Sequence, residues 1–229
     1  RIRQPAARNL ILNNTKTDII AFLDDDAVPK NVWLENIIKG YSIGGKTVAV
    51  AGPTVNCDAN LKPIDNYKRT ERVQNTVNSS GDVRFNGAWI PSRPKKCKVM
   101  IGANMSFLTD KIKSVGGFVN FYKHGYGFRE ENFPQMELLN KGYEFVYMPD
   151  AFVWHIKTRA GGADKDIEHF YLCGKNHRYF ADKFFPKWKS RLSWIFWSVS
   201  PPCLWLCIAL ALVRHELSIL KWHKGLWGK

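Results

Sequence analysis

The stretch Asp18-Ile-Ile-Ala-Phe-Leu-Asp-Asp-Asp-Ala-Val-Pro29 decides which fold the sequence predicts. Its apolar residues 19–23 have the length of a buried strand, and three consecutive aspartates follow them directly. A helix with its apolar residues at core spacing is expected before it, over residues 5–14. A second helix is expected from Pro29 to Gly40, because proline favours the first helical turn. Residues 47–51 then form the next apolar run, and this alternation indicates an α/β domain with a largely parallel sheet.

The second helix is expected to bury one apolar face, made of Val32, Trp33, Ile37 and Ile38. Residues 56–98 are polar, contain Pro and Gly, and carry a basic cluster, so we expect a long surface insertion there. Further along, the pattern predicts an ordered segment over 99–107, a helix over 110–115, a break at Gly116-Gly117, a helix over 129–141 and short strands over 143–147 and 151–154.

The chain carries a formal net charge of +14, and most of the excess lies near its end. Residues 169–229 hold ten lysines and arginines against two acidic residues, a net charge of +8. Tryptophan and leucine are interleaved with these cations, which is typical of a membrane-surface segment. We therefore expect an anionic membrane surface, and not nucleic acid, as the partner of this region.

Residues 193–213 carry no formal charge over 21 positions, which is long enough to cross a bilayer as one helix. Pro201-Pro202 lies near the middle and argues against a straight span. A re-entrant or interfacial segment is the preferred interpretation, and the alternatives are a kinked span and a helical hairpin packed on the α/β domain.

The five cysteines are scattered and form no CxxC pair, so they predict reduced, buried thiols and not a disulfide framework or a zinc site.

Asp24, Asp25 and Asp26 place three carboxylates at the carboxyl end of a predicted strand, where open α/β folds bind ligands. Three like charges in a row need a compensating cation, and carboxylate oxygens favour Mg²⁺ or Mn²⁺. A metal ion with open positions can also hold a diphosphate. The alternative is a solvated acidic turn that caps the helix after Pro29.

Glu130 and Glu131 lie at the predicted start of the helix over 129–141, where the helix dipole stabilises negative charge. This placement is compatible with simple capping and equally with a general base that takes a proton from an acceptor hydroxyl. His155 follows a predicted strand, and a single histidine acts as a metal ligand only where other ligands converge with it.

Residues 40–47, Gly-Tyr-Ser-Ile-Gly-Gly-Lys-Thr, match the Walker A pattern. A phosphate-binding loop must leave a strand and open a helix, so that backbone N–H groups face the phosphates. Here a helix is predicted to lead into the loop and a strand to leave it. We therefore interpret the match as chance.

Five segments, in chain order, resemble the inverting glycosyltransferases of family 2 that have the GT-A fold, and specifically their rhamnosyltransferase-like branch. They are Ala7-Arg8-Asn9; Phe22-Leu-Asp-Asp-Asp-Ala-Val-Pro29; Ile101-Gly-Ala-Asn-Met-Ser-Phe107 followed by Val115-Gly-Gly-Phe118; Arg129-Glu-Glu-Asn132 with Leu138 and Gly142-Tyr143; and Pro149-Asp-Ala-Phe-Val-Trp-His155. The resemblance runs from Arg3 to about Pro186. It implies a Rossmann-like GT-A domain with a mixed sheet over 1–165, to which the composition adds a basic amphipathic helix over 166–192 and a hydrophobic, membrane-associated helical tail over 193–229.

The resemblance also implies a role for each matching residue. Asp26, helped by Asp24, would hold a Mn²⁺ or Mg²⁺ ion that bridges the donor diphosphate, with His155 as a further ligand or leaving-group contact. Glu131 would be the base that deprotonates the acceptor hydroxyl, with Glu130 as the alternative. Contacts with the donor would come from Arg8, Asn9 and Asp25, and the acceptor or sugar pocket would be lined by Gly102, Ala103, Asn104 and Arg129.

The sequence departs from the family in three places. The family's first two strands, which read the nucleotide base, have no counterpart, so we expect an N-terminally truncated domain. Phe133-Pro134-Gln135 stands where the family has Asp and further polar residues, and Glu131 stands where Asp is commoner.

Together these features predict a metal-dependent inverting hexosyltransferase of polysaccharide biosynthesis. It would move a sugar from a nucleotide-sugar donor to a glycan or lipid-linked acceptor at the cytoplasmic face of the cell membrane. The alternative is a non-catalytic, membrane-associated scaffold remnant of such an enzyme.

Overall fold

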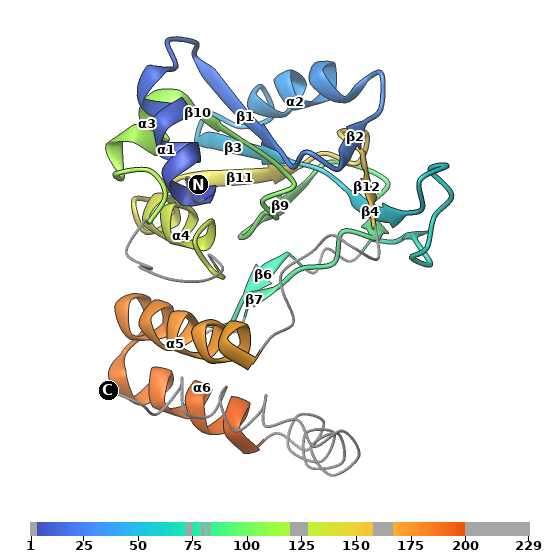
Figure 1. The fold of residues 1–229 in the computed structure, drawn as a ribbon. Coiled ribbons are helices and arrows are strands. Elements are labelled where there is room, and N and C mark those ends of the chain that lie inside the picture. Colours follow the sequence, from blue (N-terminus) through green and yellow to red (C-terminus); the bar gives the residue numbers. More distant parts are fainter. Residues whose placement is uncertain are drawn as a thin grey trace. The chain divides into compact units, whose positions relative to one another are not determined.

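The structure, a computed structural model, describes residues 4–71, 75–78, 81, 83–119, 128–157 and 167–199 (Figure 1). The chain divides into two compact units. The first comprises Arg1–Thr76, Val83–Val119 and Glu131–Gly162, and the second comprises Val77–Asp82, Asn120–Glu130 and Ala163–Lys229.

A five-stranded sheet forms the centre of the first unit. Its strand order is β1 (Ile19–Leu23), β10 (Asn104–Leu108), β3 (Thr47–Ala51), β11 (Glu144–Tyr147) and β9 (Lys95–Cys97). β3 and β11 pair in parallel, whereas β10 is antiparallel to both β1 and β3, and β9 is antiparallel to β11. The sheet is therefore mixed, as the GT-A resemblance implied. The prediction of a largely parallel sheet was wrong, because β10 returns from a distant part of the chain and inserts between the first two predicted strands.

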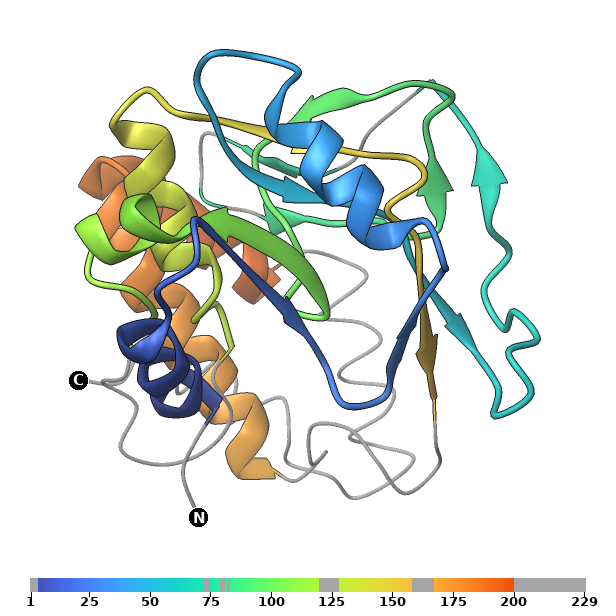
Figure 2. The ribbon, with the colours of Figure 1, turned by 90° about the horizontal axis from the view of Figure 1, so that it is seen from above.

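Helices cover both faces of this sheet, as Figures 1 and 2 show. The strand β3 is fully buried, and its alternate side chains point to opposite faces. Val50 packs with α2 (Trp33–Tyr41) through Trp33 and Ile37. Ala49 and Ala51 belong to a second cluster, which includes residues of α1 (Gln4–Asn14), α3 (Thr109–Ser114) and α4 (Asn132–Asn140).

The second helix starts later than predicted. Pro29 ends the short strand β2 (Ala27–Pro29), and α2 begins at Trp33. A proline is tolerated in β2 because the strand lies at the edge of its sheet. Trp33 and Ile37 are buried as expected, but Val32 and Ile38 are about half exposed, because they lie outside the i, i+4 stripe that faces the sheet.

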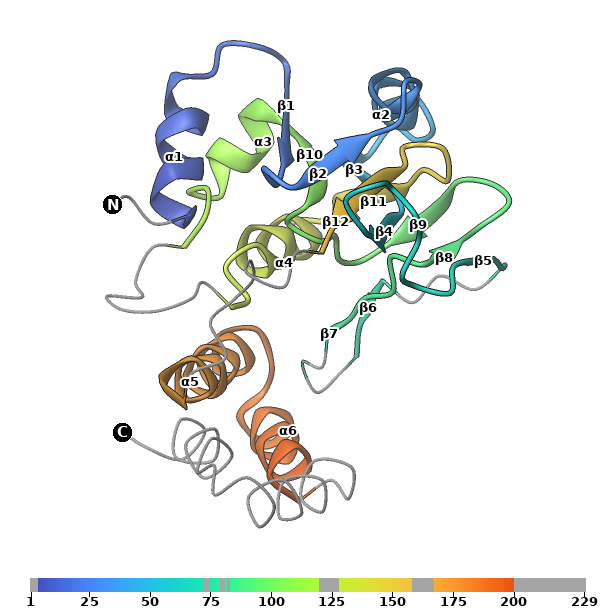
Figure 3. The same cartoon turned by 45° about the vertical axis from the view of Figure 1, so that its right-hand side comes forward.

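A three-stranded sheet in the order β2, β12 (Val153–Ile156), β4 (Thr54–Cys57) lies beside the main sheet (Figure 3). β12 is the central strand. It pairs antiparallel with β2, placing His155 opposite Ala27, and parallel with β4, placing His155 opposite Asn56. These two registers fix the functional site described below.

The predicted surface insertion over 56–98 is only partly a surface feature. It contains the two-residue strands β5 (Lys68–Arg69), β6 (Thr76–Val77), β7 (Val83–Arg84) and β8 (Trp89–Ile90). Ile90 and Cys97 are buried, however, and β9 completes one edge of the main sheet. The sequence did not show this because β9 is a basic strand, Lys-Lys-Cys, without an apolar alternation.

Cys57, Cys97 and Cys173 are buried thiols, as predicted. Burial raises the pKa of the Cys97 thiol to about 12, so this side chain behaves as a small apolar residue. Cys203 and Cys207 lie outside the described residues.

The second unit contains α5 (Ile167–Phe184) and α6 (Lys187–Val199). One helix over 166–192 was predicted, but the chain breaks at Phe185-Pro186, since proline disfavours a helical conformation in the residue before it. Polar contacts join the two helices: His177 Nε2 lies 3.2 Å from Ser193 Oγ in a buried contact, and the Ser190 hydroxyl donates to the more exposed Asp182. The predicted tail over 193–229 lies outside the described residues beyond Val199, and none of the described helices is long and apolar enough to span a bilayer.

Gly40 allows the close approach of α2 to β3. A Cβ atom at this position would lie 2.5 Å from Val50 Cγ1 and 2.9 Å from Val50 Cγ2. We therefore expect Gly40→Ala to lower the free energy of unfolding by about 2 kcal/mol, because the helix must move off the sheet. A Cβ atom on Gly45 would meet nothing within 4 Å, so Gly45→Ala is the control, with an expected change within about 0.5 kcal/mol. Urea unfolding measures both, and equal midpoints would contradict this account of the packing.

Candidate metal centre and adjoining pocket

Asp24, Asp25 and Asp26 form the turn that joins β1 to β2. The Ala27 N–H donates to the Asp24 carbonyl oxygen over 3.1 Å and closes the turn. The carboxylates therefore follow a strand, as predicted. The alternative, in which they cap the next helix, is wrong, because α2 starts after β2 and its N-cap residue, Val32, makes no side-chain capping bond.

His155 reaches this turn because β12 pairs with β2. The Ile156 N–H donates to the Asp26 carbonyl oxygen over 2.9 Å, which holds the His155 ring beside the carboxylates. His155 Nε2 lies 3.1 Å from Asp26 Oδ1 and 3.9 Å from Asp24 Oδ2. One ligand atom from each of the three residues lies within 4.8 Å of the others, a spacing that one metal ion can bridge.

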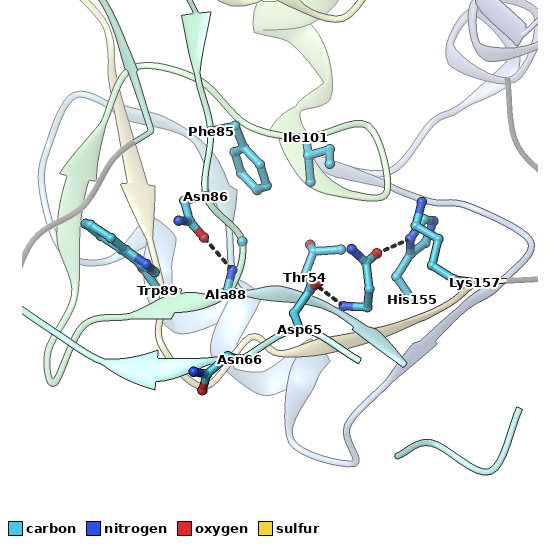
Figure 4. Close-up of a pocket in the computed structure, with 12 residues that line it drawn as sticks. Thr54, Asp65, Asn66, Phe85, Asn86, Ala88, Trp89, Ile101, His155 and Lys157 are labelled. Atoms are coloured by element: carbon cyan, nitrogen blue, oxygen red, sulfur yellow. Dashed lines mark hydrogen bonds between the residues drawn. The ribbon is translucent and has the colours of Figure 1, made fainter. Parts of the chain in front are cut away.

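The other ring nitrogen of His155 faces β4. Nδ1 lies 3.0 Å from Asn56 Oδ1, a contact that Figure 4 draws as a dashed line. A carbonyl oxygen can only accept, so Nδ1 is the donor in this contact. Nε2 is then the nitrogen that faces the aspartates.

Arg8 supplies a buried positive charge next to the cluster. Its side chain is 8% exposed, and its Nη2 atom lies 3.5 Å from both Asp24 Oδ1 and the Gly102 carbonyl oxygen. The Phe22 and Phe118 rings lie 5.9 and 5.4 Å from the guanidinium. At this position Arg8 supports Asp24 from α1, and little of its side chain is left to reach a ligand directly.

Burial raises the pKa of Asp24 above its usual range. Arg8 and then His155 oppose this shift through their charges, whereas Asp26 and Asp25 reinforce it. The local charge is thus only partly balanced by the protein itself. Two carboxylates, an imidazole nitrogen and an excess of negative charge fit a divalent cation.

A pocket of about 450 Å³ adjoins this cluster (Figure 4). His155 belongs to both, since its ring forms part of the pocket wall. The remaining lining residues are Thr54, Asn56, Asp65, Asn66, Phe85, Asn86, Gly87, Ala88, Trp89, Ile101 and Lys157. Amide and carboxylate groups and two aromatic rings thus surround a space next to the candidate metal ligands.

Asn9, which was predicted to contact the sugar donor, bonds the protein backbone with its side chain. Its side-chain amide donates to the Phe118 carbonyl oxygen over 2.6 Å, and its Oδ1 accepts from the Phe118 N–H over 2.8 Å. These bonds hold the turn at Gly117, whose φ of +68° suits glycine.

Asn104, a predicted pocket residue, is completely buried. Its Oδ1 accepts from Trp33 Nε1 over 3.0 Å, and its Nδ2 donates to the carbonyl oxygens of Pro53 and Ala151 over 3.1 and 2.9 Å. The amide therefore joins α2 to two loops of the sheet. Gly102 and Ala103 are buried beside it, and the pocket is lined instead by their neighbour Ile101.

The two predicted base candidates differ in exposure. Glu131 is half-buried in the position directly before α4, whereas Glu130 is only 2% exposed. The helix was predicted from Arg129, but it begins at Asn132, because Arg129 has a φ of +71° that no helix accommodates. In the second unit, the Arg129 guanidinium lies 4.6 Å from the Phe128 ring and 6.0 Å from the Phe180 ring.

Sequence reasoning missed the pocket residues between positions 56 and 89, because this part of the chain was predicted to be a surface insertion. The one local signal was Thr54-Val-Asn-Cys57, a short run that contains two β-branched residues and directly follows the Gly52-Pro53 break. The residues 40–47 that match Walker A join the end of α2 to β3, so a strand leaves the loop, as predicted.

Residues 3–114 match the model of the family described as Glycosyl transferase family 2. No curated protein matches the sequence. The fold is similar to that of GalNAc-T7, solved with UDP, GalNAc and Mn²⁺, with 14% identity and a TM-score of 0.63 over 97% of this chain and 40% of that one. It is also similar to the mannosyltransferase PcManGT from Pyrobaculum calidifontis in complex with GDP-Man and Mn²⁺, with 14% identity and a TM-score of 0.52 over 100% of this chain and 68% of that one.

This chain thus spans less than half the length of GalNAc-T7. The chain shares the GT-A fold with these two transferases, and the part that matches the family model, residues 3–114, is less than half of its length.

Proposed function

We propose that this chain is the metal-dependent catalytic domain of an inverting glycosyltransferase that moves a hexose from a nucleotide-sugar donor to an acceptor hydroxyl. The observation that carries this proposal is the convergence of Asp24, Asp26 and His155 beside the pocket. The two similar structures contain UDP or GDP-Man together with Mn²⁺, which supports a nucleotide-sugar donor and a divalent ion.

Asp24, Asp26 and His155 would hold the ion. A set with one imidazole and two carboxylates suits Mn²⁺ better than Mg²⁺, since Mg²⁺ prefers oxygen ligands in a strict octahedron. When bound, the ion supplies positive charge that offsets the charge of the departing nucleoside diphosphate. Arg8 would keep Asp24 ionised and oriented, and the exposed Asp25 remains available to the donor.

The pocket would take a sugar unit of the acceptor or donor. Asp65, Asn66 and Asn86 offer hydrogen-bonding groups that suit hydroxyls, and Phe85 and Trp89 offer ring surfaces that suit the apolar face of a sugar. These residues would take the role that the sequence assigned to Gly102, Ala103 and Asn104.

Glu131 is the better candidate for the base. Its position before α4 lets the helix dipole stabilise the carboxylate, and it is more accessible than Glu130. It would accept the proton of the acceptor hydroxyl as the acceptor oxygen bonds to the sugar carbon and the bond from that carbon to the diphosphate breaks. One such displacement inverts the configuration of the sugar carbon.

An acceptor that is a glycan or a lipid-linked glycan of polysaccharide biosynthesis would place the enzyme at the cytoplasmic face of a membrane. Support comes from α6, where Lys187, Trp188, Arg191 and Leu192 are all exposed and share one face of the helix. Trp188 and Leu192 are 62% and 52% exposed. Large apolar side chains with flanking cations fit the surface of an anionic bilayer.

Loss of a ligand should remove Mn²⁺ binding. We expect Asp26→Ala and His155→Ala each to weaken Mn²⁺ binding at least about tenfold, because each removes one of three ligands. Asp25→Ala is the matched control, since Asp25 lies in the same turn outside the ligand set.

Mn²⁺ binding should also weaken as the pH falls, beginning above the ordinary pKa of an aspartate, because the protonated form of Asp24 binds no metal and its pKa is raised. Isothermal titration calorimetry measures both effects, and tight binding by His155→Ala would overturn the assignment.

Nucleotide release from a panel of UDP-, GDP- and dTDP-sugars with Mn²⁺ tests the activity itself. We expect release that Asp26→Ala abolishes and that Glu131→Gln slows about 100-fold or more, with Mn²⁺ affinity unchanged in the second variant. Glu137→Gln on the same helix is the control. Silence of the folded, Mn²⁺-binding chain with every donor would favour the non-catalytic scaffold.

The α6 face can be tested with vesicles. We expect the chain to cosediment with vesicles that contain phosphatidylserine. The double variant Lys187→Gln/Arg191→Gln should bind them about 30-fold more weakly, because each cation near the surface contributes about 1 kcal/mol. Trp188→Ala/Leu192→Ala should also lose binding, whereas the control Lys62→Gln, which changes an exposed lysine of the first unit, should not. Unchanged binding by both double variants would show that this face is not the membrane contact.

A further inference from the structure

We propose that Asn56 is a positioning residue for the metal centre, which it serves by holding His155 in the tautomer that carries its proton on Nδ1. The proposal rests on the metal site put forward above. It assigns a role to a residue of the predicted surface insertion that lies outside the ligand set itself.

Asn56 is held firmly enough to orient another side chain. Its strand pairs in parallel with β12, which places Asn56 directly opposite His155. Its N–H donates to Asp65 Oδ2 over 3.1 Å, and its carbonyl oxygen accepts from the Ile64 N–H over 2.9 Å. The Lys157 N–H donates to the Cys57 carbonyl oxygen over 2.9 Å. This bond joins β12 to β4 just beyond the Asn56–His155 pair. The backbone that carries the amide is thus anchored on both sides.

The contact between the two side chains selects one arrangement of protons. Because Asn56 Oδ1 accepts from Nδ1, a neutral His155 ring has its lone pair on Nε2. That lone pair faces Asp26 Oδ1 at 3.1 Å and Asp24 Oδ2 at 3.9 Å. Two electron-pair donors at this distance repel each other unless a proton or a metal ion lies between them, and a metal ion at Nε2 leaves the hydrogen bond from Nδ1 to Asn56 intact.

The opposite tautomer would fill the site with its own hydrogen bond. If Nε2 carried the proton, it would donate to Asp26 Oδ1. Neither His155 Nε2 nor Asp26 Oδ1 could then bind a metal ion until that hydrogen bond broke. Asn56 works against this self-paired state by accepting the Nδ1 proton. A hydrogen bond from the second ring nitrogen of a metal-binding histidine commonly orients the ring and increases its basicity.

The other amides of the pocket do not share this role. Asn86 Oδ1 accepts from the Ala88 N–H over 3.1 Å, and Asn66 is exposed on the pocket wall. Asn66→Ala is therefore a matched control for Asn56→Ala: each removes one amide from the same pocket, but only the second removes the partner of Nδ1.

The first measurement needs no substitution. Long-range ¹H–¹⁵N NMR of the wild-type chain, without metal and at alkaline pH, reads which ring nitrogen of His155 carries the proton. We expect Nδ1 to give the protonated-nitrogen signal and Nε2 the lone-pair signal. A His155 ring protonated on Nε2 would overturn the proposal.

The second measurement is the affinity for Mn²⁺ alone, with no donor or acceptor. We expect Asn56→Ala to bind Mn²⁺ about 10- to 100-fold more weakly and to shift His155 toward the Nε2-protonated tautomer. Asn56→Asp keeps an acceptor opposite Nδ1 and should restore most of the affinity, whereas Asn66→Ala should change neither property. Equal affinities for Asn56→Ala and Asn66→Ala would overturn the role of Asn56.

The controls separate the possible failures. Thermal unfolding of each variant shows whether a loss of affinity reflects loss of the fold, and the wild-type tautomer decides the question if Asn56→Ala does not fold. A wild-type chain that binds no Mn²⁺ would instead refute the metal site and, with it, the proposed function. A chain that binds Mn²⁺ equally well with and without the Asn56 amide would refute this inference alone.

Discussion

The pairing of β12 with β2 on one side and β4 on the other is the constraint on which the functional site depends. Asp26, Asn56 and His155 come from three separated parts of the chain, and the two registers of β12 bring them together. The packing beneath allows no shift of these strands. A Cβ atom on Gly52 would lie 1.9 Å from the Ala151 carbonyl oxygen, and the buried amide of Asn104 bonds that same oxygen and the Pro53 carbonyl. The segments that lead into β4 and β12, at Pro53 and Ala151, are therefore held together by close packing and hydrogen bonds.

This arrangement has an electrostatic cost that a cation relieves. Three aspartates occupy one turn, and burial raises the pKa of Asp24 although Arg8 lies 3.5 Å away. The buried Arg8 balances part of the negative charge of Asp24 and Asp26. These two carboxylates are partly exposed, so a second positive charge can approach them from solvent. The same concentration of negative charge makes the cluster a good binding site for a divalent ion, and the pocket that shares His155 would place a sugar beside that ion.

Two residues show that a motif residue can stabilise the fold. Asn9 and Asn104 both lie in segments that resemble family motifs. The side-chain amide of Asn9 bonds the backbone of Phe118, and that of Asn104 accepts from the Trp33 ring N–H. Each satisfies polar groups that would otherwise be buried without partners, which is costly enough to explain the choice of asparagine. The second unit uses the same principle, since burial lowers the pKa of His177 to about 3, and this neutral ring contacts Ser193 between α5 and α6.

The sequence by itself determined the α/β class, the strand that ends in aspartates and most element positions, because apolar periodicity and Gly or Pro breaks are local properties. It also indicated Asp24, Asp26 and His155 through a resemblance carried by short motifs. Only the tertiary structure decided that β10 inserts between β1 and β3, that Asn56 contacts His155, and that most of the residues lining the pocket come from the segment 54–89. Strand order and register depend on contacts between residues far apart in the chain, and no local pattern around Asn56 specifies that a strand some hundred residues later will lie opposite it.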